Sequence, residues 1–164
     1  MERKLGLGLA LWLVLALPAG AWGTLGHRTI AAIAETNLTP DAREFVAHRL
    51  GNVSMADIAS WADSMTRDPR FPGSIWYHFE KIPDGRSYLD NLRAMPEAQR
   101  RKGGVVAAIL VAERTLRDDR ASAATRRNAL MFLIHFVGDV HQPLHTGRPE
   151  DKGGVSIKLA WFGE

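Results

Sequence analysis

The chain has 164 residues, of which 46% are hydrophobic and 24% charged, and its formal net charge is +3. This composition is typical of a folded globular protein and excludes a disordered polar chain. The small positive excess is compatible with an anionic partner but is weak support for one. Because the chain contains no cysteine, disulfides and thiolate metal sites are excluded. Any metal must be bound by histidine, carboxylate or backbone atoms.

The first residues have the pattern of a secretory signal peptide. Two basic residues precede the apolar run Leu5–Leu17, and Ala19–Ala21 provides a cleavage site with small residues. The alternative, a membrane anchor, needs an apolar run of roughly 20 residues. We therefore expect residues 1–21 to be a signal peptide and Trp22 to begin the mature chain. The protein is then secreted or periplasmic, with no stable membrane association after cleavage.

Helical periodicity dominates the sequence that follows. Apolar residues at helical spacing predict a helix after His27. Thr39–Pro40 predicts the start of a second helix, which Gly51 ends. Ser54 is the capping residue of a third predicted helix, which ends near Asp63.

The second half of the chain has the same character. Proline and glycine make residues 67–87 irregular. Further helices are predicted at 88–94, 104–117 and 123–140, a loop at 147–154 and a short strand at 155–162. No repeat or linker interrupts this pattern, so residues 22–164 are interpreted as one all-α domain.

The segment from His135 to His145 contains the strongest candidate for a chemical site. His135 and Asp139 are four residues apart and share one helix face, and their neighbours are apolar. A carboxylate in such surroundings must be hydrogen-bonded, paired or bound to a metal. His145 follows the break at Pro143 and can fold back over the helix end. The alternative is a buried His–Asp pair with an unrelated loop histidine.

Other candidate ligands are dispersed along the chain. Each of them also has an ordinary explanation. Asp63 could be a solvated helix end, His78 a packed core histidine, and His27 a surface histidine. Trp22 differs because signal cleavage would free its α-amine, whose reference pKa is about 7.7–8.0. A metal can displace that proton, and the amine and the Trp22 carbonyl can then chelate one ion.

These residues together resemble a known family, the zinc-dependent single-strand-specific nucleases of the S1 and P1 type. The resemblance extends over nearly all of residues 22–163. It rests on five segments: Trp22–Arg28, Ser60–Asp63, His78–Phe79, His135–His145 and Asp151–Gly154.

The resemblance implies a fold and an activity. The fold is a single multi-helix domain of the zinc phospholipase C and P1 nuclease type. The activity is that of an endonuclease that hydrolyses phosphodiester bonds of single-stranded DNA or RNA to 5′-phosphates, with 3′-nucleotidase activity left open. Two alternatives remain: a phosphodiesterase similar to zinc phospholipase C, and an inactive exported zinc-binding fragment.

The resemblance also implies a ligand set for three zinc ions. The first ion, with the zinc-bound water as the catalytic group, is bound by Asp63, His78, His135 and Asp139. The second is bound by Trp22, His27 and a bridging Asp139. The third takes His145 together with ligands from a later Asn-x-His-x-x-x-Asp-like segment. We expect a domain that is incomplete at its C-terminus, supports two ions and has little activity alone.

Substrate contacts are implied less directly. Phe79 could stack on an unpaired base or simply pack in the core. Arg67 lies one position after the place where the family has arginine, and Thr66 occupies that place. Lys81 stands where the family often has Asp or Asn, and Val155 where it usually has Asn. The nature of the nucleic acid and the oligomeric state are not determined by the sequence.

Overall fold

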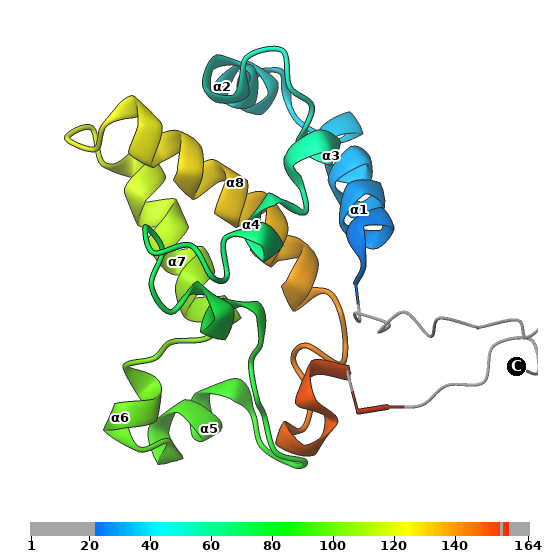
Figure 1. Cartoon of the computed structure of the whole chain (residues 1–164), viewed down its shortest axis with the longest axis vertical. Helices are drawn as coiled ribbons and strands as arrows, with labels where there is room; N and C mark the ends of the chain where they lie inside the picture. Colours follow the sequence, from blue (N-terminus) through cyan, green and yellow to red (C-terminus); the bar gives the residue numbers. More distant parts are fainter. Residues whose placement is uncertain (1–21, 155, 158–164) are drawn as a thin grey trace, which may run out of the picture.

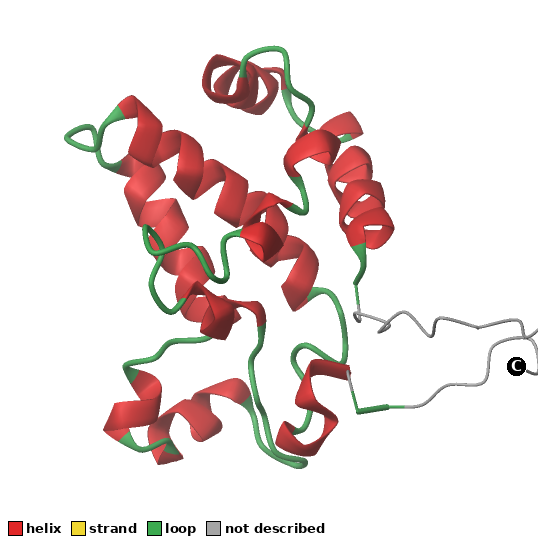
Figure 2. Cartoon of the chain, viewed as in Figure 1, coloured by secondary structure: helices red, strands yellow, loops and turns green. Residues whose placement is uncertain are grey.

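The computed structural model describes residues 22–154 together with residues 156 and 157. Within this part of the chain all regular structure is helical, which confirms the all-α prediction (Figures 1 and 2). None of the described helices is long and apolar enough to cross a membrane. The helices are α1 (Thr24–Thr36), α2 (Pro40–Leu50), α3 (Met55–Ile58), α4 (Trp61–Ser64), η1 (Ser74–His78), α5 (Tyr88–Ala94), α6 (Glu97–Arg100), α7 (Val105–Arg117), α8 (Ala123–Val140) and η2 (Pro149–Gly154).

The two longest helices of the second half, α7 and α8, pack side by side as an antiparallel pair (Figure 1). The Ser122 side chain accepts a hydrogen bond from the Thr125 backbone N–H and so caps the start of α8. Both helices have the predicted bounds to within one residue. The elements α1, α2, α3, α4 and η1 also pack against α8, which makes this helix the centre of the fold.

The N-terminal helices α1, α2 and α3 form a second layer. The Thr39 side chain caps α2 with Pro40 in its first turn, and Gly51 ends α2 with φ of 67°. The Ser54 side chain accepts a hydrogen bond from the Asp57 N–H at the start of α3. These three boundaries confirm the sequence prediction. Helix α1 lies beside α3 and contacts α8 (Figure 1).

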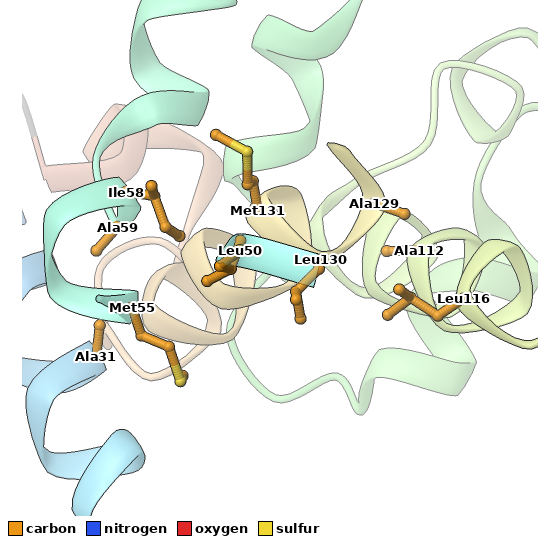
Figure 3. Packing of buried hydrophobic residues seen from close by; sticks show 10 residues of the cluster. All are labelled: Ala31, Leu50, Met55, Ile58, Ala59, Ala112, Leu116, Ala129, Leu130 and Met131. Atoms are coloured by element: carbon orange, nitrogen blue, oxygen red, sulfur yellow. The ribbon is translucent and has the colours of Figure 1, made fainter. Parts of the chain in front are cut away.

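The buried core joins the two layers. Figure 3 shows the main apolar cluster, whose side chains come from α1, α2, α3, α7 and α8. A separate group of aromatic rings packs α4 and the following loop against α8: Trp61 and Phe71 lie edge-on to Phe132, with ring centroids 4.9 and 5.1 Å apart. These contacts place α4 and η1 over the C-terminal half of α8.

The prediction of one continuous helix from Ser54 to Asp63 is wrong. The chain forms α3 and α4 as two short helices, and Ser60 between them has φ of −98° and ψ of 7°. The break leaves the Ala59 carbonyl oxygen outside a regular helix. That oxygen lies 2.6 Å from Nδ1 of His135 on α8. A tertiary hydrogen bond therefore takes the place of a helical one at this point.

Smaller differences occur elsewhere. Residues 67–87 are irregular as predicted, except for the 3-10 helix η1, and α5 has the predicted bounds. The short helix α6 was not predicted. The predicted loop at 147–154 contains η2, which is interrupted by Lys152 and Gly153 at positive φ. The predicted strand at 155–162 falls mostly outside the described residues, and Ser156 and Ile157 are not part of a strand.

Candidate metal centre

The C-terminal half of α8 presents two buried side chains one turn apart. His135 is fully buried and Asp139 is 1% exposed. His135 Nε2 lies 3.1 Å from Asp139 Oδ2. The four-residue spacing in the sequence predicted this shared face.

His78, at the end of η1, completes a close triad with these two residues. Its Nδ1 lies 3.0 Å from Asp139 Oδ2 and 3.0 Å from His135 Nε2. His78 is 5% exposed, and its other ring nitrogen is buried with no hydrogen-bond partner. One oxygen and two nitrogens thus converge on one point, and these residues form a group that could hold a metal ion.

Asp63, on α4, lies at the solvent side of this triad. Its Oδ1 is 3.5 Å from His135 Nε2 and 3.7 Å from His78 Nδ1, and its side chain is 51% exposed. It is therefore the member of the cluster that can reach both the buried nitrogens and a ligand arriving from solvent.

His27, in the first turn of α1, lies on the other side of Asp139. Its Nε2 is 3.4 Å from Asp139 Oδ1. Its ring stacks on the His135 ring, with centroids 4.0 Å apart and an interplanar angle of 15°. His27 is only 3% exposed, so the alternative of a surface histidine is wrong, and the structure brings this residue beside Asp139.

His145 folds back to the same carboxylate. Its Nε2 lies 3.6 Å from Asp139 Oδ1, and the residue is 7% exposed. The alternative of an unrelated loop histidine is therefore also wrong. By contrast, His141 in the same segment is exposed, and its Nδ1 lies 2.7 Å from the Val137 carbonyl oxygen.

Backbone carbonyls orient two of these imidazoles. Nδ1 of His135 lies 2.6 Å from the Ala59 oxygen, and Nδ1 of His145 lies 2.9 Å from the Gly153 oxygen. A carbonyl only accepts, so each Nδ1 donates a proton and each Nε2 can direct its lone pair at the cluster. Such outer contacts fix the tautomer of metal-binding histidines.

The ionisation of the cluster follows from burial and from the shared carboxylate. Burial, with the neighbouring His135 adding to it, lowers the pKa of His27 to about 4. Burial opposes ionisation of Asp139, but hydrogen bonds from His135 and His78 outweigh it and lower its pKa to about 2. Burial also opposes charging of His135, yet the bond to Asp139 prevails and raises its pKa. The carboxylate is thus anionic at neutral pH, while His27 is neutral and able to bind a metal.

Three other predicted site residues lie at the margins of the cluster. Trp22 precedes α1 and its indole packs against Gly26, one residue before His27. Phe79 is half-buried and lies edge-on to His145, with ring centroids 4.8 Å apart. Arg67 is exposed in the turn after α4, and no hydrogen bond or ion pair joins it to the described cluster. The geometry thus connects Trp22 and Phe79 to the centre but not Arg67.

Comparison with known proteins agrees with this geometry. Residues 22–164 match the family model described as S1/P1 Nuclease. The chain belongs to the S1/P1 nuclease family. It is 32% identical to Endonuclease 2 of Arabidopsis thaliana over 94% of this chain and 56% of the relative. It is 34% identical to Nuclease P1 of Penicillium citrinum over 87% of this chain and 53% of the relative. For Nuclease S1 of Aspergillus oryzae the identity is 32%, over 100% of this chain and 57% of the relative.

The chain therefore spans about half the length of the curated relatives it matches. The S1/P1 family is zinc-dependent, so the donor set can be tested against that metal. Ligands about 2.0–2.2 Å from a tetrahedral zinc ion lie about 3.3–3.6 Å from one another. The donor atoms of His78, His135 and Asp139 are 3.0–3.1 Å apart, and Asp63 Oδ1 lies 3.5 and 3.7 Å from the nitrogens of His135 and His78. These separations are close to those expected around one zinc ion, and the nitrogen and oxygen donors suit zinc in their chemistry.

The charges also fit a cation. No described lysine or arginine lies within 4.0 Å of Asp139, whose neighbours are four histidines. A buried carboxylate without a permanent positive partner is costly. Asp139 raises the pKa of His135 and so favours a positive charge at this point, and a metal ion would supply that charge in place of a proton.

Gly138 is a site residue that the sequence interpretation did not identify. It lies inside α8, and a Cβ at this position would be 3.1 Å from Nδ1 of His27. Glycine inside a helix costs about 0.5–1 kcal/mol relative to alanine, so its presence there indicates a close approach. The Ala59 and Gly153 carbonyls were also missed, because a backbone atom that orients a histidine leaves no signature in side-chain type.

We expect Gly138→Ala to weaken zinc binding without unfolding the protein. The added methyl group favours the helix but displaces the His27 ring by a few tenths of an ångström. Zinc affinity at the His27 position should fall about tenfold, as for outer contacts of other metal sites. Titration against a competing chelator measures this. Val137→Ala, at the exposed neighbouring position, is the control, and equal zinc affinity in the two variants would contradict the expectation.

Proposed function

We propose that this S1/P1 nuclease domain belongs to a zinc-dependent endonuclease that hydrolyses phosphodiester bonds of single-stranded DNA or RNA to 5′-phosphates. The observation that carries the proposal is the convergence of His78, His135 and Asp139 within 3.0–3.1 Å. Asp63 supports it by extending this buried triad toward solvent. Names of the relatives, which include nucleases and endonucleases, agree with the proposed activity.

In this proposal Asp63, His78, His135 and Asp139 hold one zinc ion, and Trp22, His27 and Asp139 hold a second. His145 is one ligand toward a third. When bound, zinc would activate water as the nucleophile and neutralise charge that develops on the phosphate. The two oxygens of Asp139 face different histidines, so this carboxylate can bridge two ions.

The chain's own side chains organise the remainder of the site. The histidines of the cluster are buried, whereas the Asp63 side chain is 51% exposed and gives the cluster a side that is open to solvent. Phe79 lies beside His145 and is half-buried. Its ring offers a surface for an unpaired base, which is hidden in a duplex, and this favours single strands. We further propose that residues 1–21 direct export, so that the nuclease acts outside the cytoplasm.

The test uses the full-length protein with single-stranded DNA, with and without a chelator. We expect cleavage products with 5′-phosphates, loss of cleavage in the chelator, and recovery when zinc is added back. A duplex of the same sequence should be cut much more slowly. Cleavage that is indifferent to the chelator would overturn the metal mechanism. Release of phosphocholine from vesicles without any cleavage of nucleic acid would instead assign the site to phospholipid.

A further inference from the structure

A groove of about 710 Å³ lies between η1 and the segment that contains α5 and α6. Phe79 belongs to its wall and also lies against the His145 ring, so the groove is next to the metal centre. All three lysines of the described residues line it: Lys81, Lys102 and Lys152. Composition alone gives no reason for lysine to gather at one place on the surface.

The lysines leave the groove positively charged. Within the described part of the chain, none of the three has an acidic partner among the ion pairs. The one acidic residue in the lining, Glu80, is 6% exposed, and its carboxylate accepts a hydrogen bond from the backbone N–H of Val106 at the start of α7. Its charge is therefore directed into the fold, and the open face of the groove suits a polyanion.

The groove also contains an exposed aromatic ring. Trp76 is 50% exposed and lies two residues before His78 on η1. Lys102 Nζ is 5.2 Å from the centroid of the Trp76 ring. An indole beside a lysine provides a stacking face and a phosphate contact together, which is the combination that single-stranded nucleic acids need.

We propose that this groove binds the nucleotide next to the one at the metal centre, with its base stacked on Trp76 and its phosphate near Lys102. The inference rests on the proposed nuclease function and extends it. It makes the substrate an oligonucleotide that crosses the groove, rather than a dinucleotide held only at the metal centre.

Kinetics with substrates of two lengths test the proposal. Trp76→Ala should raise KM for a single-stranded 12-mer about tenfold relative to KM for a dinucleotide, as expected for loss of one stacked base. Trp76→Phe keeps an aromatic face and should restore most of the preference. Circular dichroism of both variants verifies the fold. An unchanged ratio of the two KM values in Trp76→Ala would overturn the proposal.

Binding in a chelator gives a second readout that needs no cleavage. The full-length protein is mixed with a fluorescent 12-mer, and affinity is measured by anisotropy at several salt concentrations. Lys102→Gln should reduce the slope of log affinity against log salt by about 0.7, the value for one phosphate of a single strand. Arg43→Gln removes an equal charge from α2, which does not line the groove, and should keep the slope.

Two further results would reject the groove. One is displacement of the 12-mer by polyglutamate at equal charge concentration, because polyglutamate has charge but no bases. The other is equal anisotropy curves for wild type and Trp76→Ala. If the wild type still shows chelator-sensitive cleavage, either result would reject the groove but not the proposed function. Absence of any chelator-sensitive cleavage by wild type would reject the function itself and with it the groove.

Discussion

Replacing Asp139 with asparagine is expected to reduce cleavage of single-stranded DNA by more than about a hundredfold. Outer contacts of metal sites already change affinity or activity by about 10–100-fold, and a direct ligand should cost at least as much. The Asp139 oxygens are 3.0–3.6 Å from nitrogens of four histidines. The asparagine amide keeps the shape of the side chain but removes the negative charge that lies between the four histidines. Initial cleavage rates measure the first effect.

Zinc content measures the second effect of Asp139→Asn. If the carboxylate bridges two ions, the variant should lose more than one ion per chain, which mass spectrometry of the native protein counts. Asp119→Asn is the matched control, because the Asp119 side chain is fully exposed and its one ion pair among the described residues is with Arg126 at 3.4 Å. A variant at Asp139 that kept all its zinc and a normal rate would contradict the bridging role.

Much of this fold follows from local sequence. Helices α7 and α8 have apolar residues at helical spacing, and their ends are marked by Gly104 and Ser122. The relation of His135 to Asp139 follows directly from the four-residue repeat of a helix. For these elements the local pattern and the tertiary packing favour the same structure, so a prediction from sequence is dependable.

Other parts depend on contacts between distant segments. The break at Ala59–Ser60 lies in a run that would make a good helix, and the hydrogen bond between the Ala59 carbonyl and His135 connects residues 76 positions apart. His78 stands among aromatic residues, where its sequence environment is equally compatible with a packed core. Periodicity cannot predict that its Nδ1 faces Asp139. The resemblance to the nuclease family implied that the two residues share an ion, and the fold gives the contact itself.

The groove beside Phe79 was also beyond local reasoning. Lys81 and Lys152 are far apart in the sequence, and Lys152 lies in a turn with φ of 51° that pattern analysis cannot anticipate. Nothing in the sequence relates the three lysines to one another, and only the folded chain brings them together in the lining of one groove. Charge distribution in space, not net charge, indicates the partner here.

Retaining one extra residue before Trp22 is expected to remove one zinc ion from the centre. Extension by Ala21 turns the Trp22 amine into an amide, whose nitrogen has no lone pair available for a metal. The Trp22 indole lies against Gly26, where a Cβ would overlap the ring, and is therefore held beside the turn that carries His27. A free amine at this position could then bind the second ion that we propose for His27 and Asp139.

Two preparations of the protein without its signal peptide measure this effect, one that begins at Trp22 and one that begins at Ala21. We expect the second to bind about one zinc ion fewer and to cleave about a hundredfold more slowly, as for other losses of metal contacts. Helical content should be the same in both. Equal zinc counts would contradict a role for the amine.

A substitution at the same position separates the amine from the indole. Trp22→Phe, in a chain that begins at this residue, keeps the amine and the carbonyl but has a smaller ring. Because the chelating atoms belong to the backbone, this variant should retain its zinc, with some loss of stability where the indole covered Gly26. The opposite pattern, zinc lost in Trp22→Phe and kept after extension by Ala21, would mean that the side chain supports His27 by packing and that the terminus is not a ligand.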